Sequence, residues 1–242
     1  MQDEQIIDLL GYKAQLQLIG EEATALLERL VTCRVDDLSV GQTRPGALLT
    51  PQGKVIADFV LERIETGFTL HLHQDALADM AKRMKLYKLR AKIDIVPVDA
   101  TTVSVGDEGT RISAGLPAFG IDYGPAEVFP TDINLDRRDG IDYRKGCFVG
   151  QEVASRMMRR GKIRKRTLHL AVSNAVKGDT IMAAETPLGT VTSATNDVAL
   201  GLVRIDRLKA ALDQGATMTV NGVAVSFDQN ANLKHDLESL DA

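Results

Sequence analysis

The chain has 242 residues, of which 44% are hydrophobic and 26% are charged. This composition supports a folded protein with at least one buried core, and it excludes the disordered and fibrous classes. The formal net charge of -4 disfavours non-specific binding to duplex nucleic acid, although a local basic patch remains open.

Cysteine content and hydropathy further narrow the class of protein to which the chain can belong. Cys33 and Cys147 are too few for a disulfide scaffold or a four-ligand metal site, so we expect no metal centre. No apolar run approaches the roughly 18 residues of a membrane helix. The N-terminal residues are acidic and lack the basic region of a secretory signal. We therefore expect a cytoplasmic protein in a reducing environment.

The first half of the chain mixes helical and strand patterns. Apolar residues recur at helical spacing over 20–30, and the alternation of residues 54–61 and 68–73 around a turn predicts an antiparallel pair. A second amphipathic helix is predicted over 75–90, and the β-branched stretch 91–105 predicts one or two strands. Together these patterns predict an α+β body with antiparallel sheets and packed helices.

The sequence pattern changes after Gly161. Short strand-like runs follow one another, and the Asn221-Gly222 pair between apolar alternations is typical of a two-residue hairpin turn. Several short strands with turns between them predict a small β-barrel or sandwich. We therefore divide the chain into a body over 1–160, a β-barrel over 161–228 and a polar tail over 229–242.

Cys147 lies in a segment with unusual chemistry. Gly146 and Gly150 flank it, and a helical pattern begins at Gln151 and ends near Gly161. A helix N-terminus and nearby basic side chains both stabilise a thiolate. On local chemistry alone, a nucleophilic or redox cysteine and a small residue packed into a tight turn are equally good interpretations.

The segment 156–166 is strongly basic, with seven Lys or Arg side chains in eleven residues. Such a run is compatible with nucleic acid, a small polyanion, an acidic protein partner or a solvated linker. The absence of interleaved aromatic residues argues against stacking on single strands. We favour a small polyanion or an acidic partner, with the solvated linker as the next alternative.

The string Lys145-Gly-Cys-Phe-Val-Gly-Gln-Glu152, followed by Arg156, resembles the signature K-G-C-[YF]-x-G-Q-E-x-x-x-R of the YgfZ-type folate-binding family. Segments 49–54, 87–92 and 111–122 are similar to other parts of that family in the same order, and the likeness runs from about residue 15 to residue 208. The resemblance implies a body like the folate-binding domain of aminomethyltransferases, followed by a small C-terminal β-barrel.

The resemblance also implies a function. It points to a tetrahydrofolate-binding (or other reduced-folate-binding) accessory protein for the assembly or maintenance of iron–sulfur enzymes. Its implied partners are the folate and iron–sulfur client or assembly proteins. Cys147 is the implied reactive residue. The implied folate-binding residues are Asp132, Asn134, Lys145, Gly146, Gly150, Gln151, Glu152 and Arg156.

Two positions depart from the related proteins. Asp132 stands where the family reads P-x-E-x-N, so its carboxylate is one methylene shorter for gripping a pterin. Aminomethyltransferases place two adjacent acids where this chain has Ala57 and Asp58. The loss of one acid weakens the alternative of a folate-dependent one-carbon transferase, which needs a placed carboxylate for protonation control. A thiol redox module without folate is a third alternative, and nucleic-acid binding is a fourth.

Overall fold

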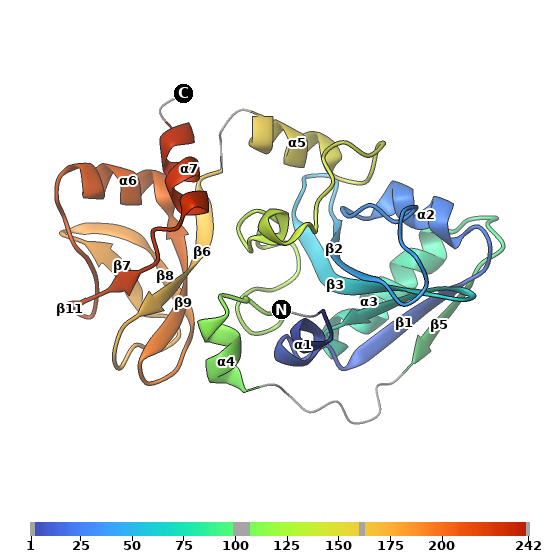
Figure 1. The fold of residues 1–242 in the computed structure, drawn as a ribbon, viewed down its shortest axis with the longest axis horizontal. Coiled ribbons are helices and arrows are strands. Elements are labelled where there is room, and N and C mark those ends of the chain that lie inside the picture. The colour runs from blue at the N-terminus through green and yellow to red at the C-terminus, as the bar shows by residue number, and fades with distance from the viewer. Residues whose placement is uncertain (1–2, 99–106, 160–162, 241–242) are drawn as a thin grey trace.

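The computed structural model describes residues 3–98, 107–159 and 163–240. Within these ranges the chain forms an α+β body and a β-barrel that lie side by side (Figure 1). The expected division at residue 160 and the expected helix end at Gly161 lie outside the described residues, so these boundaries stay predictions.

The body is built on one antiparallel sheet, in the spatial order β2-β3-β4-β1-β5. The alternation over 54–61 and 68–73 predicted its central hairpin, and β3 and β4 do pair with Val60 opposite His71. The strands of this sheet have the following bounds: β1 Ala14–Ile19, β2 Thr43–Leu49, β3 Val55–Ile64, β4 Gly67–Leu72 and β5 Asp94–Val98.

Helices flank this sheet and close its core. The apolar residues at helical spacing in 23–30 are buried, as the pattern predicted. The helix expected over 75–90 begins one residue earlier and ends at Tyr87. The helical segments of the body are α1 Asp3–Leu9, α2 Ala23–Leu30, α3 Gln74–Tyr87, α4 Glu108–Ser113, the 3-10 helix η1 Leu135–Arg138 and α5 Gln151–Arg159.

Strand β3 is more buried than its sequence predicts. Alternation predicts one buried face, yet every residue from Val55 to Leu61 is buried. One face packs on the main core, and Val60 on the other face packs in a second cluster with Leu10 of the α1 segment and Leu116 after α4. Asp58 therefore lies in the interior rather than on a solvated face.

The C-terminal part forms a seven-stranded antiparallel sheet that curls into a nearly closed barrel, in the order β11-β10-β7-β8-β9-β6-β12. Asn221 and Gly222 both have positive φ, 50° and 79°, so the predicted hairpin turn joins β10 to β11. The elements are β6 Lys165–Ala171, β7 Thr180–Ala183, β8 Thr186–Ala194, β9 Val198–Arg204, α6 Ile205–Asp213, β10 Met218–Val220, β11 Val223–Ala224, β12 Ser226–Phe227 and α7 Ala231–Ser239.

The segment expected as a polar tail, 229–242, contains the docked helix α7. Asn230 caps the helix by accepting a hydrogen bond from the Leu233 amide at 3.0 Å. Leu233 is buried in the barrel core, and the Asp236 side chain is only 9% exposed. The polar composition hid this helix because its docking depends on a few leucines, of which Leu233 is the buried one, and on the ion pairs of Asp236 with Arg137 and Arg166.

A network of buried charges joins the barrel to the body. Arg166 of β6 donates to both carboxylate oxygens of Asp136 at 2.6 and 2.9 Å and to Asp236 at 2.8 and 3.2 Å. It also donates to the Thr131 carbonyl at 2.8 Å, and Arg137 forms a further ion pair with Asp236. Because the Arg166 side chain is 2% exposed, this network holds the loop 131–137, strand β6 and helix α7 together.

Replacing Asp236 by Asn should destabilise the protein, because it removes one carboxylate from two buried or half-buried guanidinium groups. Breaking a buried pair in this way costs roughly 3 kcal/mol, which for a chain of this size lowers Tm by about 6–12 °C. The matched control is Asp79→Asn, which breaks the exposed pair with Arg83 and should cost less than about 0.5 kcal/mol. Equal effects of the two variants in thermal denaturation would contradict this role of Asp236.

Candidate functional site

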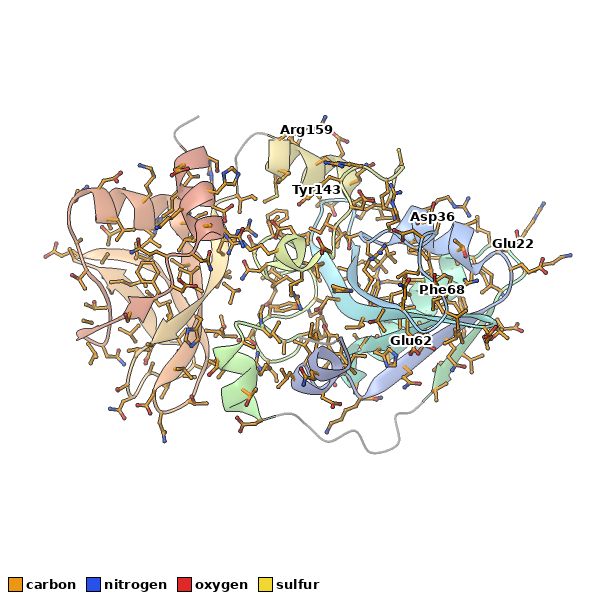
Figure 2. The ribbon with its side chains drawn as sticks, viewed as in Figure 1. Glu22, Asp36, Glu62, Phe68, Tyr143 and Arg159 are labelled. Carbon is orange, nitrogen blue, oxygen red and sulfur yellow. The ribbon has the colours of Figure 1, made fainter. Side chains whose placement is uncertain are left out.

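The signature segment forms a loop that leads into helix α5. Cys147 is exposed, four residues before α5 begins at Gln151. Tyr143 and Arg159, which bracket the loop and the helix, are labelled in Figure 2. The other cysteine, Cys33, is completely buried, and burial raises the pKa of its thiol to about 12. Of the two thiols, only Cys147 is placed to react with a molecule in solution.

Lys145 anchors this loop to the body. Its side chain is 2% exposed, and its ammonium donates to the carbonyls of Val31 at 3.1 Å and Cys33 at 2.6 Å. It also pairs with Glu28 at 2.9 Å. Burial raises the pKa of Glu28, but the hydrogen bonds from Lys145 and from two backbone amides outweigh it, so this pKa lies below its ordinary value.

The position of Lys145 differs from the expectation that it contacts folate. The sequence shows a lysine beside the cysteine, but long side chains can turn into the protein wherever carbonyls and a carboxylate can receive the ammonium. Lys145 thus fixes the loop that carries Cys147, and its charge lies in the interior rather than at the exposed loop surface.

Gly150 lies where this loop crosses the turn after β2. Its φ is 80°, and a methyl group on it would lie 2.6 Å from the Thr50 carbonyl and 2.9 Å from the Leu49 Cβ. On the other side of the crossing, a methyl group on Gly53 would lie 2.9 Å from Val153 of α5. Two glycines therefore let the loop and helix α5 pack directly on the turn 50–53.

Asp132 lies in a small cavity between body and barrel. The cavity has a volume of about 180 Å³ and is lined by Lys54, Phe129, Asp132, Met157, Arg164, Lys165 and Arg204. Asp132 is 4% exposed, and its Oδ2 accepts a hydrogen bond from the Phe129 amide at 2.9 Å. The Lys54 ammonium lies 3.9 Å from the centre of the Phe129 ring. The site thus combines one buried carboxyl, one aromatic wall and a basic rim.

The charges at this cavity influence one another. Burial raises the pKa of Asp132 above its ordinary value, and the hydrogen bond from Phe129 and the charge of Lys54 offset only part of that effect. Burial likewise lowers the pKa of Lys54, with Asp132 acting in the opposite direction. A polar ligand that donates hydrogen bonds to Asp132 would stabilise its ionised form.

Asn134 belongs to a different cavity. Its amide nitrogen donates to the Thr167 carbonyl at 2.8 Å, and its backbone is left-handed with φ 57°. With Arg138 and His169 it lines a cavity of about 310 Å³. The structure therefore separates two residues that the sequence motif places together, because the chain turns sharply between Asp132 and Asn134.

Asp58 is enclosed by two tyrosines. Tyr123 donates to its carboxylate at 2.6 Å, and Tyr12 donates to the other oxygen. Burial and the charge of Asp58 raise the pKa of both phenols well above the ordinary value. Ala57, which stands at the place of a second acid, is also buried. In this arrangement Asp58 already accepts two strong hydrogen bonds in the core.

The remaining expected residues lie at the surface. Gly146, Glu152 and Arg156 are exposed, and Gln151 is half-buried with its amide 3.4 Å from the Lys145 carbonyl. Among the described residues, no three His, Cys, Asp or Glu side chains are grouped to hold a metal ion. In the same part of the chain, no helix has the length and apolar character needed to cross a bilayer.

Sequence reasoning missed several side chains that line the Asp132 cavity. Phe129 and Arg204 carry no motif of their own, and Lys54 ends the family-like segment 49–54 without a ligand role assigned to it. Only the fold brings the three to Asp132. Arg164 and Lys165 gave a signal, because they belong to the basic run that we linked to a small polyanion. Their presence at the cavity is compatible with that interpretation.

Comparison with known proteins gives matches to both parts of the chain. Residues 164–234 match the family model described as CAF17, C-terminal beta-barrel domain. The solved structure of the glycine cleavage system aminomethyltransferase T from Bartonella henselae aligns with a TM-score of 0.74 and 14% identity, covering 96% of this chain and 88% of that one. The expected aminomethyltransferase-like fold with a C-terminal barrel is thereby confirmed, although this likeness shows the fold alone.

Curated relatives share the sequence at low identity. A mitochondrial iron-sulfur cluster assembly factor IBA57 homolog from Coccidioides immitis is 23% identical, with 67% of this chain and 56% of that protein aligned. The mitochondrial iron-sulfur cluster assembly factor IBA57 of Mus musculus is 21% identical, covering 83% of this chain and 78% of that protein. The chain spans about half the length of several of the fungal relatives that it matches.

These relatives correct one expectation and refine another. Their names place them in mitochondria, which contradicts the expected cytoplasmic location. The cytoplasmic expectation rested in part on the two cysteines, and free thiols suit any reducing compartment. The chain is similar to IBA57-type assembly factors, whereas membership of the YgfZ type in particular stays a prediction.

Replacing Gly150 by Ala should destabilise the protein by about 3 kcal/mol, because the methyl group meets backbone at 2.6 Å and φ is 80°. Gly146→Ala is the matched control, since a methyl group there has nothing within 4 Å, and it should change the free energy of unfolding by less than about 0.5 kcal/mol. Urea denaturation measures both values. A tolerated Gly150→Ala would refute the close crossing of loop and turn.

Proposed function

We propose that this chain is a tetrahydrofolate-binding accessory protein in the assembly or maintenance of iron–sulfur enzymes, with Cys147 as its reactive residue. The observation that carries the proposal is the cavity at Asp132, which joins a buried carboxyl to a basic rim. The similarity to proteins named as iron-sulfur cluster assembly factors supports the cellular role.

The cavity fits the chemistry of a folate in three respects. A pterin presents adjacent N–H groups, and a carboxylate oxygen has two lone pairs, so Asp132 can accept from the pterin while it holds the Phe129 amide. The Phe129 ring offers an apolar wall for a flat heterocycle. Arg164 and Lys165, which form no ion pair within the described residues, supply positive charge for the glutamate carboxylates, which extend beyond a cavity of about 180 Å³.

Each part of the site then has a role. Asp132 orients the pterin, and the basic rim binds the acidic end of the ligand. A bound reduced folate supplies a carrier for one-carbon units. Residues of both α5 and β6 line the cavity, since Met157 belongs to α5 and Lys165 to β6. A ligand there contacts the helix that follows Cys147 as well as the barrel.

Cys147 suits contact with a protein client rather than chemistry in a closed pocket. Its side chain is exposed, and the buried anchor at Lys145 and the crossing at Gly150 hold the loop on either side of it. A thiol on a fixed loop reaches a client surface at little cost in chain entropy. This geometry favours a thiol that acts on an iron–sulfur protein.

The alternative, a folate-dependent one-carbon transferase, has weaker support. That chemistry needs a carboxylate placed at the transferred group. Asp58 is 2% exposed and accepts hydrogen bonds from Tyr12 and Tyr123. The neighbouring residue, Ala57, has no carboxyl group. We therefore place folate binding and the thiol ahead of transferase activity.

Replacing Asp132 by Asn should weaken tetrahydrofolate binding at least about tenfold, because charge-assisted hydrogen bonds to the pterin are lost. In the unmodified protein the affinity should fall as pH is lowered through the raised pKa of Asp132, since a protonated carboxyl accepts fewer N–H groups. Asp132→Asn should lose this pH dependence. Anaerobic calorimetry measures both, with Asp228→Asn at the other cavity as the control. Unchanged affinity in Asp132→Asn would place folate elsewhere.

Replacing Cys147 by Ser should abolish rescue of iron–sulfur enzyme activity in a strain that lacks its own related assembly factor. Folding and tetrahydrofolate affinity should be retained, because Cys147 is exposed and does not line the Asp132 cavity. Cys33→Ala removes the other thiol and should still rescue. Full rescue by Cys147→Ser would exclude a reactive role for this residue.

A further inference from the structure

Helix α2 and the end of α3 lie on the side of the body away from the barrel (Figure 1). Residues of α2 and of the segment that ends α3 line a groove there. It has a volume of about 370 Å³, and Glu22, labelled in Figure 2, marks its edge. Its apolar lining is Leu26 and Leu30 of α2, Tyr87 at the end of α3, and Leu89 and Ala91 after it, and its charged lining is Glu22, Arg29, Lys88 and Arg90. None of these residues belongs to the Asp132 cavity or the Cys147 loop.

Two leucines beside the groove are unusually exposed. Leu86 is 69% exposed and Leu89 is 83% exposed. Leu89 is itself part of the groove wall. Leu86 directly precedes Tyr87, which also lines the groove. Single exposed apolar residues are common, but two large ones within four residues at the edge of a groove are a feature of interaction sites.

The exposure of Leu89 is imposed by a fixed backbone. Leu89 has φ 46°, a left-handed conformation that favours glycine at the end of a helix. The loop after it is pinned, because the Lys88 ammonium donates to the Ile93 carbonyl at 2.6 Å and the Lys92 amide donates to Glu22 at 2.6 Å. A methyl group on Gly20 would lie 2.4 Å from the Lys92 carbonyl, so this loop also packs on the chain before α2. The strained backbone at Leu89 keeps its own side chain exposed to solvent, and such strain is a feature of functional sites.

The surface around the groove is basic in a protein of net charge -4. The exposed cations around it form no ion pair within the described part of the chain, whereas Arg34, Arg83 and Arg204 each pair with a carboxylate. The unpaired ones are Arg29, Lys82, Lys85, Arg90 and Lys92. The acids nearby are Glu22, which holds the Lys92 amide, Asp79, which pairs with Arg83, and the exposed Glu21 and Asp94.

We propose that this groove is a docking site for an acidic segment of a partner protein that carries large apolar side chains. The apolar lining and the two leucines would receive the apolar side chains, and the unpaired cations would receive the carboxylates. A concave groove suits a peptide segment, whereas a bilayer surface requires a convex or flat one. The proposal does not depend on folate binding or on Cys147.

The test uses a fluorescein-labelled 15-residue amphipathic peptide with leucines at helical spacing and glutamates at the other positions. A second peptide has lysine in place of each glutamate. The peptides are titrated into the full chain and into Leu89→Gly, Arg90→Glu and Val176→Ser, with fluorescence anisotropy as the readout. Val176 is a matched control because it is an exposed apolar residue of the barrel, 60% exposed.

The acidic peptide should bind saturably and more weakly at high salt, and the lysine peptide should not bind. Leu89→Gly and Arg90→Glu should each weaken binding about tenfold or more, and Val176→Ser should not change it. Leu89→Gly should also raise Tm, since glycine relieves the left-handed strain, so its loss of binding is not a folding defect. Equal binding by Leu89→Gly, no saturable binding of the acidic peptide, or binding only to phosphatidylglycerol vesicles would overturn the proposal.

Discussion

The contact between the loop 131–136 and the first residues of β6 sets the geometry of both halves of the molecule. Arg166 binds Asp136 and the Thr131 carbonyl, and the next residue, Thr167, donates from its amide and its hydroxyl to the Asp132 carbonyl at 2.8 and 2.9 Å. A buried guanidinium without these partners would be very costly. The barrel is held on the body here and at a second contact, where Arg111 and Asp122 bind the Ser193 hydroxyl of β8. Residues next to the Arg166 contact line the cavities at Asp132 and Asn134.

A second constraint acts on the signature loop. Lys145 turns inward to the carbonyls of Val31 and Cys33, and Gly150 lets the loop cross the turn at Thr50. Much of the motif thus shapes and fixes the loop, and the exposed thiol of Cys147 is what the loop presents. The motif marks a place on the protein that is rigid and open to a large partner. Helix α5 follows the Cys147 loop, and its residue Met157 lines the cavity at Asp132, so this helix links the loop to the cavity.

The sequence predicts the fold better than it predicts the site. Alternation and helical spacing identify the hairpin of β3 and β4, the helices α2 and α3 and the Asn221-Gly222 turn, because these signals are local. They miss the docking of α7, which depends on Asp236 meeting Arg166, and they miss the second buried face of β3, which depends on α1 and α4. At the proposed site, the resemblance singles out Cys147 and Asp132 as candidates. It gives no sign that Lys145 points inward or that Asn134 faces another cavity. Nor does it show that Lys54, Phe129 and Arg204 line the cavity at Asp132. Each of these facts depends on the tertiary path of the chain.

The most direct test of this account is amide hydrogen exchange at Thr167 with and without tetrahydrofolate. Its N–H donates to the Asp132 carbonyl across the contact between body and barrel. A folate held by Asp132 and Lys165 bridges that contact, so exchange at Thr167 should slow when the ligand is bound. Tight binding of tetrahydrofolate with unchanged exchange at Thr167 would contradict a folate site at this contact.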